Sequence, residues 1–203
     1  MRFRERYTQH MSGARVVRSS VIWLASWALI PMMVLAGSDS ADEDEPAPLL
    51  GTLTRAEIES ALPDWLAEET PEADFQAAVD LVLQTDGSHM DVYFGTWCSD
   101  SRREIARFWQ ALDAAGGRLG FTIRYVGVDR EKEEPAELLH DVGLEYVPTF
   151  VVYSGDTEVG RVVEESPNGI EVDLLQLLSG EVSGVVSVRD DLEVDEPLAG
   201  GVD

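Results

Sequence analysis

The order of secondary-structure signals downstream of residue 90 constrains the fold of this chain more than any single motif. Residues 90–94 are strand-forming, residues 105–115 repeat apolar side chains at helical spacing, and residues 121–128 form a second strand-like run. A short helical stretch, two strand-like runs around a turn at Gly155 and a last apolar helix follow. Strands joined through a helix are parallel, whereas strands joined by a tight turn are antiparallel. The order therefore predicts an α/β fold with a mixed central sheet flanked by helices, in which a parallel βαβ unit precedes an antiparallel ββα unit.

Two further helices are predicted before this unit. Thr54 and Glu57 have the spacing of a capping box, which predicts a short helix directly after Thr54. Thr70 followed by Pro71 predicts the start of a second helix, with proline in its first turn. The predicted folded domain therefore spans residues 54–180.

The charge of the chain is unevenly distributed. The formal net charge is −24, yet residues 1–36 carry five arginines and one acidic residue. Residues 21–36 form an uncharged apolar run that contains Pro31, ends in small residues and is shorter than the roughly 20 residues of a spanning helix. We interpret residues 1–38 as a secretory signal peptide or, if uncleaved, an N-terminal membrane anchor. Because arginines precede the run, the remainder is expected outside the cytoplasm, in the periplasm or secreted, or held at the inner membrane.

Acidic segments flank the predicted domain. Residues 39–53 begin with DSADEDEPAP and are interpreted as an acidic disordered linker, and residues 181–203 are interpreted as an acidic flexible tail. A surface this acidic repels nucleic acid and anionic lipid, so neither is expected as a partner of the folded domain.

Cys98 is the only cysteine of the chain, and it lies between the strand at 90–94 and the helix that follows. A thiol reacts as its thiolate, and the first turn of a helix stabilises negative charge through its free N–H groups and dipole. This position indicates a reactive cysteine; the alternative is that Cys98 is a small buried apolar side chain.

Two segments of the sequence resemble signatures of the thioredoxin superfamily. Trp97-Cys98-Ser99-Asp100-Ser101, with a strand before and a helix after, is similar to the active-site segment of that family. Val147-Pro148-Thr149-Phe150 is similar to its second signature, a cis-proline that opens the strand facing the cysteine. The resemblance covers roughly residues 70–180, and the residues around Cys98 also resemble a subgroup of exported bacterial thioredoxin-like proteins, here with a Cys-X-X-Ser site.

The resemblance implies a thioredoxin-like fold and a role for each matched residue. Cys98 would be the attacking thiol and Trp97 would cover its approach side. Pro148 would lie beside the thiol, with the backbone around Val147 open to an extended substrate. Ser101, one helical turn after Cys98, would donate a hydrogen bond to the thiolate.

Two departures from the family pattern bear on the mechanism: with one cysteine in the chain, dithiol exchange is excluded for a single copy of the protein, and the proton relay is missing as well. Ser101 occupies the position of the second cysteine, and Val92 occupies the position of a buried acid that relays protons in thioredoxins. Asp91 is adjacent, but alternation along the strand places it on the opposite face.

The remaining chemistry is monothiol exchange with protein thiols and disulfides or low-molecular-weight thiols, and turnover then needs an external thiol or a reductase. The alternatives are a redox-inert thioredoxin-like module that binds a partner along the Val147–Pro148 groove, or a thiol sensor or peroxidase that forms a sulfenic acid. The three histidines lack metal-ligand spacing, so no metal and no cofactor is predicted.

Overall fold

The structure is a computed structural model that describes residues 47–69, 71–84, 87–117 and 119–192. The predicted signal peptide or anchor (1–38), the first part of the linker (39–46) and the last part of the tail (193–203) lie outside the described residues. Within those ranges, no helix combines the length and apolar character that crossing a membrane requires.

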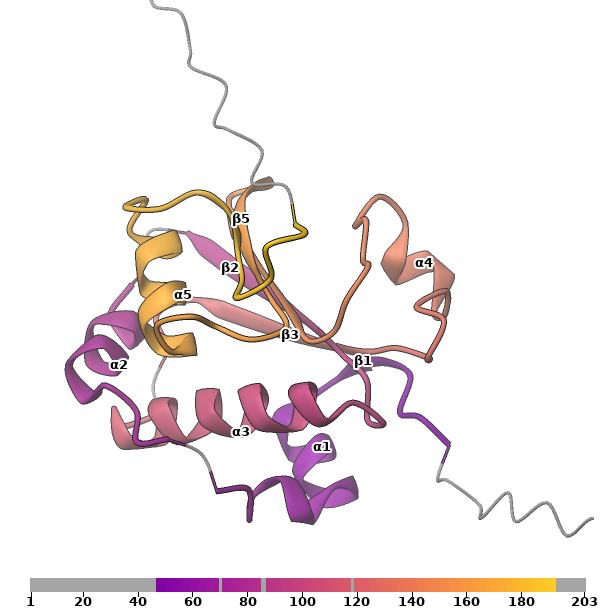
Figure 1. The fold of residues 1–203 in the computed structure, drawn as a ribbon. Helices are drawn as coiled ribbons and strands as arrows, with labels where there is room; N and C mark the ends of the chain where they lie inside the picture. Colours follow the sequence, from indigo (N-terminus) through magenta and orange to yellow (C-terminus); the bar gives the residue numbers. More distant parts are fainter. Residues whose placement is uncertain (1–46, 70, 85–86, 118, 193–203) are drawn as a thin grey trace, which may run out of the picture. The chain divides into compact units, whose positions relative to one another are not determined.

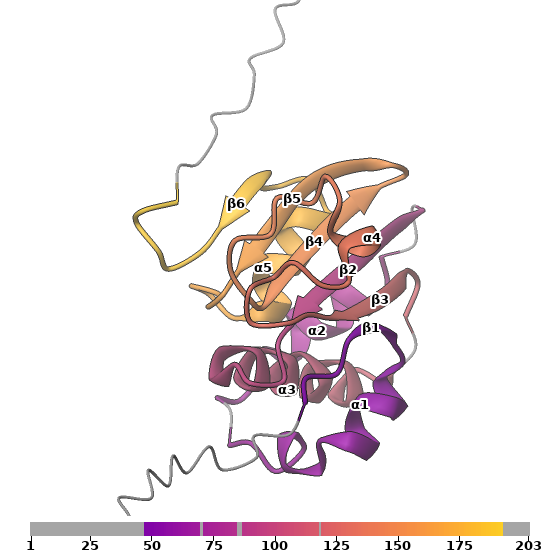
Figure 2. The ribbon, with the colours of Figure 1, turned by 90° about the vertical axis from the view of Figure 1, so that its right-hand side faces the viewer.

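The described residues form one six-stranded mixed sheet, with the strands in the spatial order β1-β3-β2-β4-β5-β6 (Figures 1 and 2). The pair β2–β3 is parallel, and β2–β4 and β4–β5 are antiparallel. This arrangement confirms the predicted mixed sheet, and the fold is thioredoxin-like α/β. The strands are β1 (Gly51–Leu53), β2 (Ser88–Phe94), β3 (Thr122–Gly127), β4 (Thr149–Ser154), β5 (Thr157–Val163) and β6 (Gly184–Val186).

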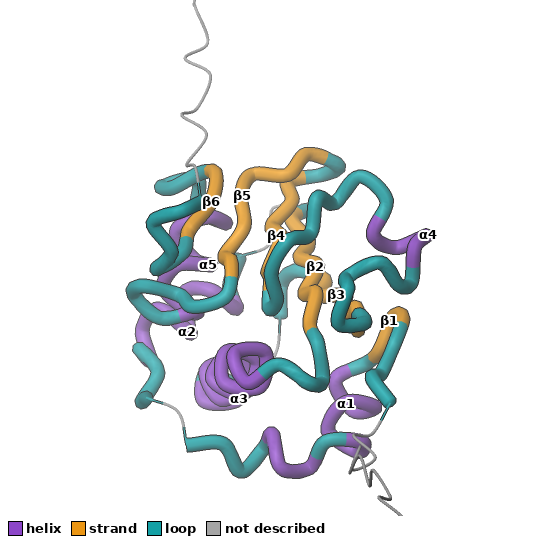
Figure 3. The backbone as a smooth tube through the Cα atoms, turned by 45° about the vertical axis from the view of Figure 1, so that its right-hand side comes forward, coloured by secondary structure: helices purple, strands orange, loops and turns teal. Residues whose placement is uncertain are grey.

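Helices cover both faces of the sheet, as Figure 3 shows. The face that carries Met90, Val92 and Phe94 packs against α1, α2, α3 and α5, and the face that carries Tyr93 and Val151 packs against the short α4. This division follows from the alternation of side chains along each strand. The helices are α1 (Arg55–Ala61), the 3-10 turn η1 (Pro63–Trp65), α2 (Phe75–Val82), α3 (Ser99–Ala114), α4 (Ala136–Leu139) and α5 (Ile170–Leu178).

The predicted capping box is present at the start of α1. The Thr54 side chain accepts a hydrogen bond from the Glu57 N–H, and the Glu57 carboxylate accepts one from the Thr54 N–H at 2.7 Å. The predicted start of the next helix is wrong. That helix, α2, begins at Phe75, because the Asp74 carboxylate caps it by accepting the Ala77 N–H at 2.9 Å.

Two segments that the sequence placed outside the domain are strands. Residues 51–53, assigned to the linker, form β1 and pair antiparallel with β3. Residues 184–186, assigned to the tail, form β6 and pair in parallel with β5. Close backbone approach explains β6: a Cβ on Gly160 would lie 2.5 Å from the Gly184 carbonyl oxygen, so only glycine lets the two strands meet.

Candidate functional site

Cys98 is the N-cap residue of α3, in an extended conformation with φ −97° and ψ 122°. Its carbonyl oxygen accepts the first helical hydrogen bond, from the Arg102 N–H at 3.2 Å. Its sulfur accepts the Ser101 N–H, with 3.5 Å between the nitrogen and Sγ. The half-buried sulfur therefore takes the place of a capping oxygen, at the helix end where backbone dipoles favour negative charge.

The sulfur also contacts the segment that leads into β4. The Cys98 thiol donates a hydrogen bond to the Val147 carbonyl oxygen, with Sγ 3.2 Å from the oxygen. The peptide bond between Val147 and Pro148 is cis, as predicted. The structure thus brings together the two segments that the sequence resemblance paired.

The exposure of this segment differs from the expectation. Pro148 is buried and Val147 is only 4% exposed, so the backbone is not open to an extended chain in this conformation. Val147 is buried because it packs with Val151, Val128 and other apolar residues of the α4 face of the sheet.

Ser101 lies close to the sulfur, but its hydroxyl has a different partner from the predicted one. The side chain is fully buried, and its oxygen accepts the Gly95 N–H at 3.3 Å. The contact from Ser101 to the sulfur is made by the backbone N–H. In the structure the hydroxyl therefore holds the turn between β2 and α3, which places Cys98 at the helix start.

Trp97 packs beside Cys98 against the apolar cluster of the α4 face. Its ring lies directly on Gly95, where a Cβ would come within 2.5 Å of the indole Cε2. The Arg130 guanidinium carbon lies 5.0 Å from the centre of the ring. Among the described residues, none provides a hydrogen-bond partner for the buried Trp97 Nε1.

The charged groups at the start of α3 pair with one another. Arg103 contacts Asp100 at 2.8 Å and Glu104 at 3.1 Å, and it also reaches Glu165 of the loop after β5 at 3.4 Å. Burial raises the pKa of Glu104 above its ordinary value, and the ion pair with Arg103 offsets part of that rise. Arg102 pairs with Glu68.

Val92, at the position of the proton-relaying acid of thioredoxins, and its neighbour Asp91 lie on the faces of the sheet that were predicted. Val92 is fully buried on the face that packs against α1, α2, α3 and α5, and Asp91 lies on the opposite face, where it pairs with Arg124. The Tyr93 hydroxyl donates to Asp91 at 3.4 Å, and burial raises the pKa of Tyr93 to about 12. The Asp91 carboxylate, which belongs to β2, therefore neutralises Arg124 of β3.

Three clefts in the described part of the chain are not lined by Cys98. One, of about 710 Å³, lies between Tyr146, the β5–β6 edge and Asp191. Two others, of about 620 Å³ and 550 Å³, lie by the first residues of β2 and by β1. In the described ranges, no His, Cys, Asp and Glu side chains are grouped so as to hold a metal ion.

No protein-family profile and no curated protein matches the sequence. Among solved structures, the chain is similar to thioredoxin (Mala s 13) of Malassezia sympodialis, with 21% identity and a TM-score of 0.36, over 48% of this chain and 80% of that one. It is also similar to thioredoxin f of spinach chloroplast, with 19% identity and a TM-score of 0.31, over 49% and 74% of the two chains. A Pseudomonas aeruginosa protein of unknown function has 12% identity and a TM-score of 0.41, over 64% of this chain and 99% of that one. The thioredoxin-like assignment of the fold rests on the strand order and connections described above.

Proposed function

We propose that this protein is an exported, monothiol thiol–disulfide oxidoreductase whose nucleophile is Cys98. The observation that supports this proposal best is the position of the sulfur, which caps α3 through the Ser101 N–H and faces the carbonyl of Val147. A helix N-terminus lowers the free energy of a thiolate relative to the thiol.

The two contacts of the sulfur favour different protonation states. The N–H of Ser101 stabilises the thiolate, whereas the bond to the Val147 oxygen requires the thiol proton. We infer that the reaction begins when this proton leaves to solvent and the sulfur separates from the carbonyl.

The exchange then runs in two balanced steps. The Cys98 thiolate attacks one sulfur of a client disulfide, so that a mixed disulfide forms and the other client sulfur leaves as a thiolate. A second thiolate, from a low-molecular-weight thiol or a thiol reductase, attacks the client sulfur of the mixed disulfide and releases Cys98 as a thiolate. Because the chain has one cysteine, this second thiol must come from outside it.

The proposed location is outside the cytoplasm, in the periplasm or secreted, with residues 1–38 as a signal peptide or as an anchor in the inner membrane. The basic residues before the apolar run at 21–36 support this proposal. The proposed partners are protein thiols and disulfides or low-molecular-weight thiols.

The test is the rate of Cys98 alkylation by iodoacetamide as a function of pH, with Cys98→Ser as the control. A rate that reaches half its maximum well below the free-thiol value of about 8.5 supports the proposal. The wild type should then form a mixed disulfide with an oxidised peptide that Cys98→Ser does not form. A folded protein that is alkylated only above that value, or not at all, contradicts the proposal.

The second candidate is a redox-inert binding module, and the contact between the Cys98 thiol and the Val147 carbonyl, with Sγ 3.2 Å from the oxygen, favours it because this contact occupies the sulfur. In that case, partner binding survives Cys98→Ser. A thiol sensor or peroxidase instead predicts peroxide consumption that is lost in the same variant.

A further inference from the structure

The segment after β6 is attached to the loops on either side of Pro148. The Val188 N–H donates to the Glu165 carbonyl at 3.2 Å, and the Ser187 hydroxyl donates to the Val163 carbonyl at 2.8 Å. These bonds continue the parallel pairing of β6 along the end of β5. They place the next residue, Arg189, beside both loops.

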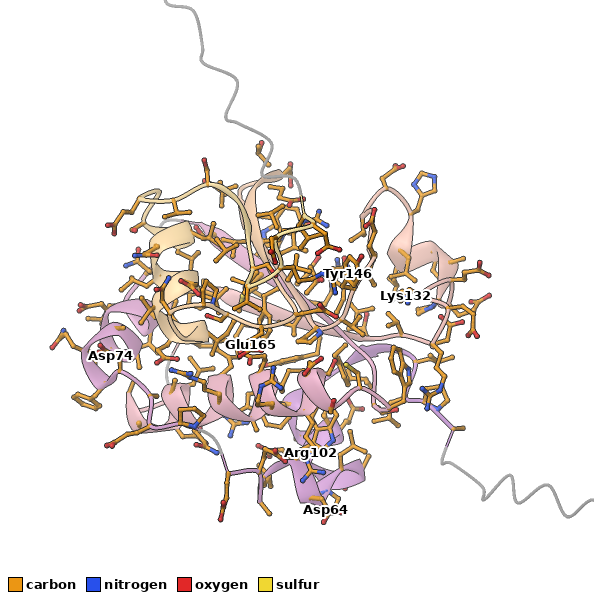
Figure 4. All side chains as sticks on the ribbon, in the orientation of Figure 1. Asp64, Asp74, Arg102, Lys132, Tyr146 and Glu165 are labelled. Carbon is orange, nitrogen blue, oxygen red and sulfur yellow. The ribbon has the colours of Figure 1, made fainter. Side chains whose placement is uncertain are left out.

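Arg189 makes contacts to both loops at once. Its guanidinium carbon lies 4.0 Å from the centre of the Tyr146 ring, and its Nη2 donates to the Tyr146 hydroxyl at 3.3 Å. Its Nη1 donates to the Glu164 carboxylate at 2.8 Å, and Asp191 accepts two further bonds. Figure 4 shows Tyr146 on the loop before β4 and Glu165, the neighbour of Glu164, on the loop after β5.

Both loops are directly connected to the carbonyl that contacts the sulfur. Tyr146 immediately precedes Val147, whose oxygen accepts the Cys98 thiol. On the other side, the Glu164 N–H donates to the Pro148 carbonyl at 2.8 Å. The two loops therefore hold the residues on either side of the Val147 carbonyl, and a displacement of either loop would act on its position relative to the sulfur.

We propose that Arg189 is a positioning residue, which holds the Val147 carbonyl against Cys98 by clamping Tyr146 and Glu164 together. The proposal rests on the proposed function, since it concerns the reactivity of the same thiol. It assigns a functional role to the segment from Ser187 to Leu192.

Loss of the clamp should change the pH of half-maximal alkylation of Cys98, and the direction of that change distinguishes a positioning role of Arg189 from a direct electrostatic effect of its charge. The bond to the Val147 oxygen is made only by the protonated thiol, so its loss favours the thiolate and lowers the pH of half-maximal alkylation. Removing a positive charge near a thiolate would instead raise that pH. The other charged groups near the start of α3 stay in place, because Arg103 pairs with Asp100 and Glu104, and Arg102 pairs with Glu68. Arg130 remains over the Trp97 ring, and Glu165 contacts Arg103.

The experiment compares iodoacetamide alkylation against pH for the full chain and four variants. Arg189→Gln and Tyr146→Leu should each lower the half-maximal pH by roughly 0.5 to 1 unit, the equivalent of one hydrogen bond. Combining them should add little, since both break the same clamp. Arg55→Gln is the matched control: Arg55 also stacks on an aromatic ring, Trp109 at 5.1 Å, and pairs with Asp113, but near the other end of α3.

An unchanged or raised half-maximal pH in Arg189→Gln would overturn the positioning role, as would an equal shift in Arg55→Gln. If Arg189→Gln does not fold, Arg189→Lys is tested instead. Lysine keeps the positive charge but cannot stack a planar guanidinium on Tyr146 while it donates to Glu164, so the same decrease in the half-maximal pH is expected. A folded wild type that is not alkylated at any pH contradicts the proposed function instead. In that case, alkylation that appears in Arg189→Gln still supports the clamp, and its absence overturns the clamp as well.

Discussion

The ion pair between Arg107 and Glu171 connects three helices, and its removal provides the sharpest test of how the domain is held together. Glu171 of α5 is fully buried, and its two carboxylate oxygens accept from Arg107 of α3 at 3.1 and 3.2 Å. The same carboxylate accepts the Asp74 N–H, at the N-cap of α2, at 2.8 Å. Arg107→Leu would leave a buried carboxylate with that one hydrogen bond.

The expected loss of unfolding free energy in Arg107→Leu is about 3 to 5 kcal/mol, the usual result of removing one partner of a buried ion pair. Arg102→Leu is the matched control on the same helix. The Arg102 side chain is 44% exposed, against 18% for Arg107, and it pairs with the partly exposed Glu68. An exposed pair contributes about 0 to 1 kcal/mol, so the control should lose much less.

The assay is urea unfolding followed by circular dichroism at neutral pH, with the double variant Arg107→Leu/Glu171→Leu as a third sample. The double variant should recover much of the lost stability, because no unpaired charge remains in the core. Its recovery should fall short by about 1 to 3 kcal/mol, since the Asp74 N–H loses its acceptor. A loss in Arg107→Leu no larger than in Arg102→Leu would refute the reasoning.

Three further changes have defined outcomes. Glu104→Gln should stabilise the protein at neutral pH, because burial raises the pKa of this carboxyl above its ordinary value of 4.5 and makes its ionisation unfavourable in the folded state. The advantage should shrink as pH falls below that raised value, and urea titrations at several pH values measure it. Gly160→Ala should separate β6 from β5, since its Cβ would lie 2.5 Å from the Gly184 oxygen, and it should shift Cys98 alkylation in the same direction as Arg189→Gln. Gly95→Ala should displace the Trp97 ring and cost about 1 to 3 kcal/mol; an unchanged urea midpoint and an unchanged alkylation rate would show that the ring adapts without strain.

The central part of the fold was predictable because its signals are local. The strand that ends at Phe94, the N-cap position of Cys98 and the apolar face of α3 follow one another within about 25 residues of sequence. Side-chain period, capping residues and a tight turn are each readable over a few positions. Together they determined the order of the central strands and helices along the chain and the helix that begins at the thiol. The pairing of Cys98 with the Pro148 segment was instead implied by the resemblance of both segments to thioredoxin-superfamily signatures.

The structure alone decided where the edge strands and the partners of the site residues lie. β1 and β6 are three residues long, which is too short for an alternating pattern, and they exist because a neighbouring strand supplies hydrogen bonds. The Ser101 hydroxyl bonds to Gly95 rather than to the sulfur, and Arg189 lies 43 residues from Tyr146 in the chain. Sequence by itself determined the central elements, from β2 to α5, since their signals depend on neighbours along the chain. Which polar group meets which depended on contacts between distant segments, because a side chain's partners are set only once the backbone has closed around it.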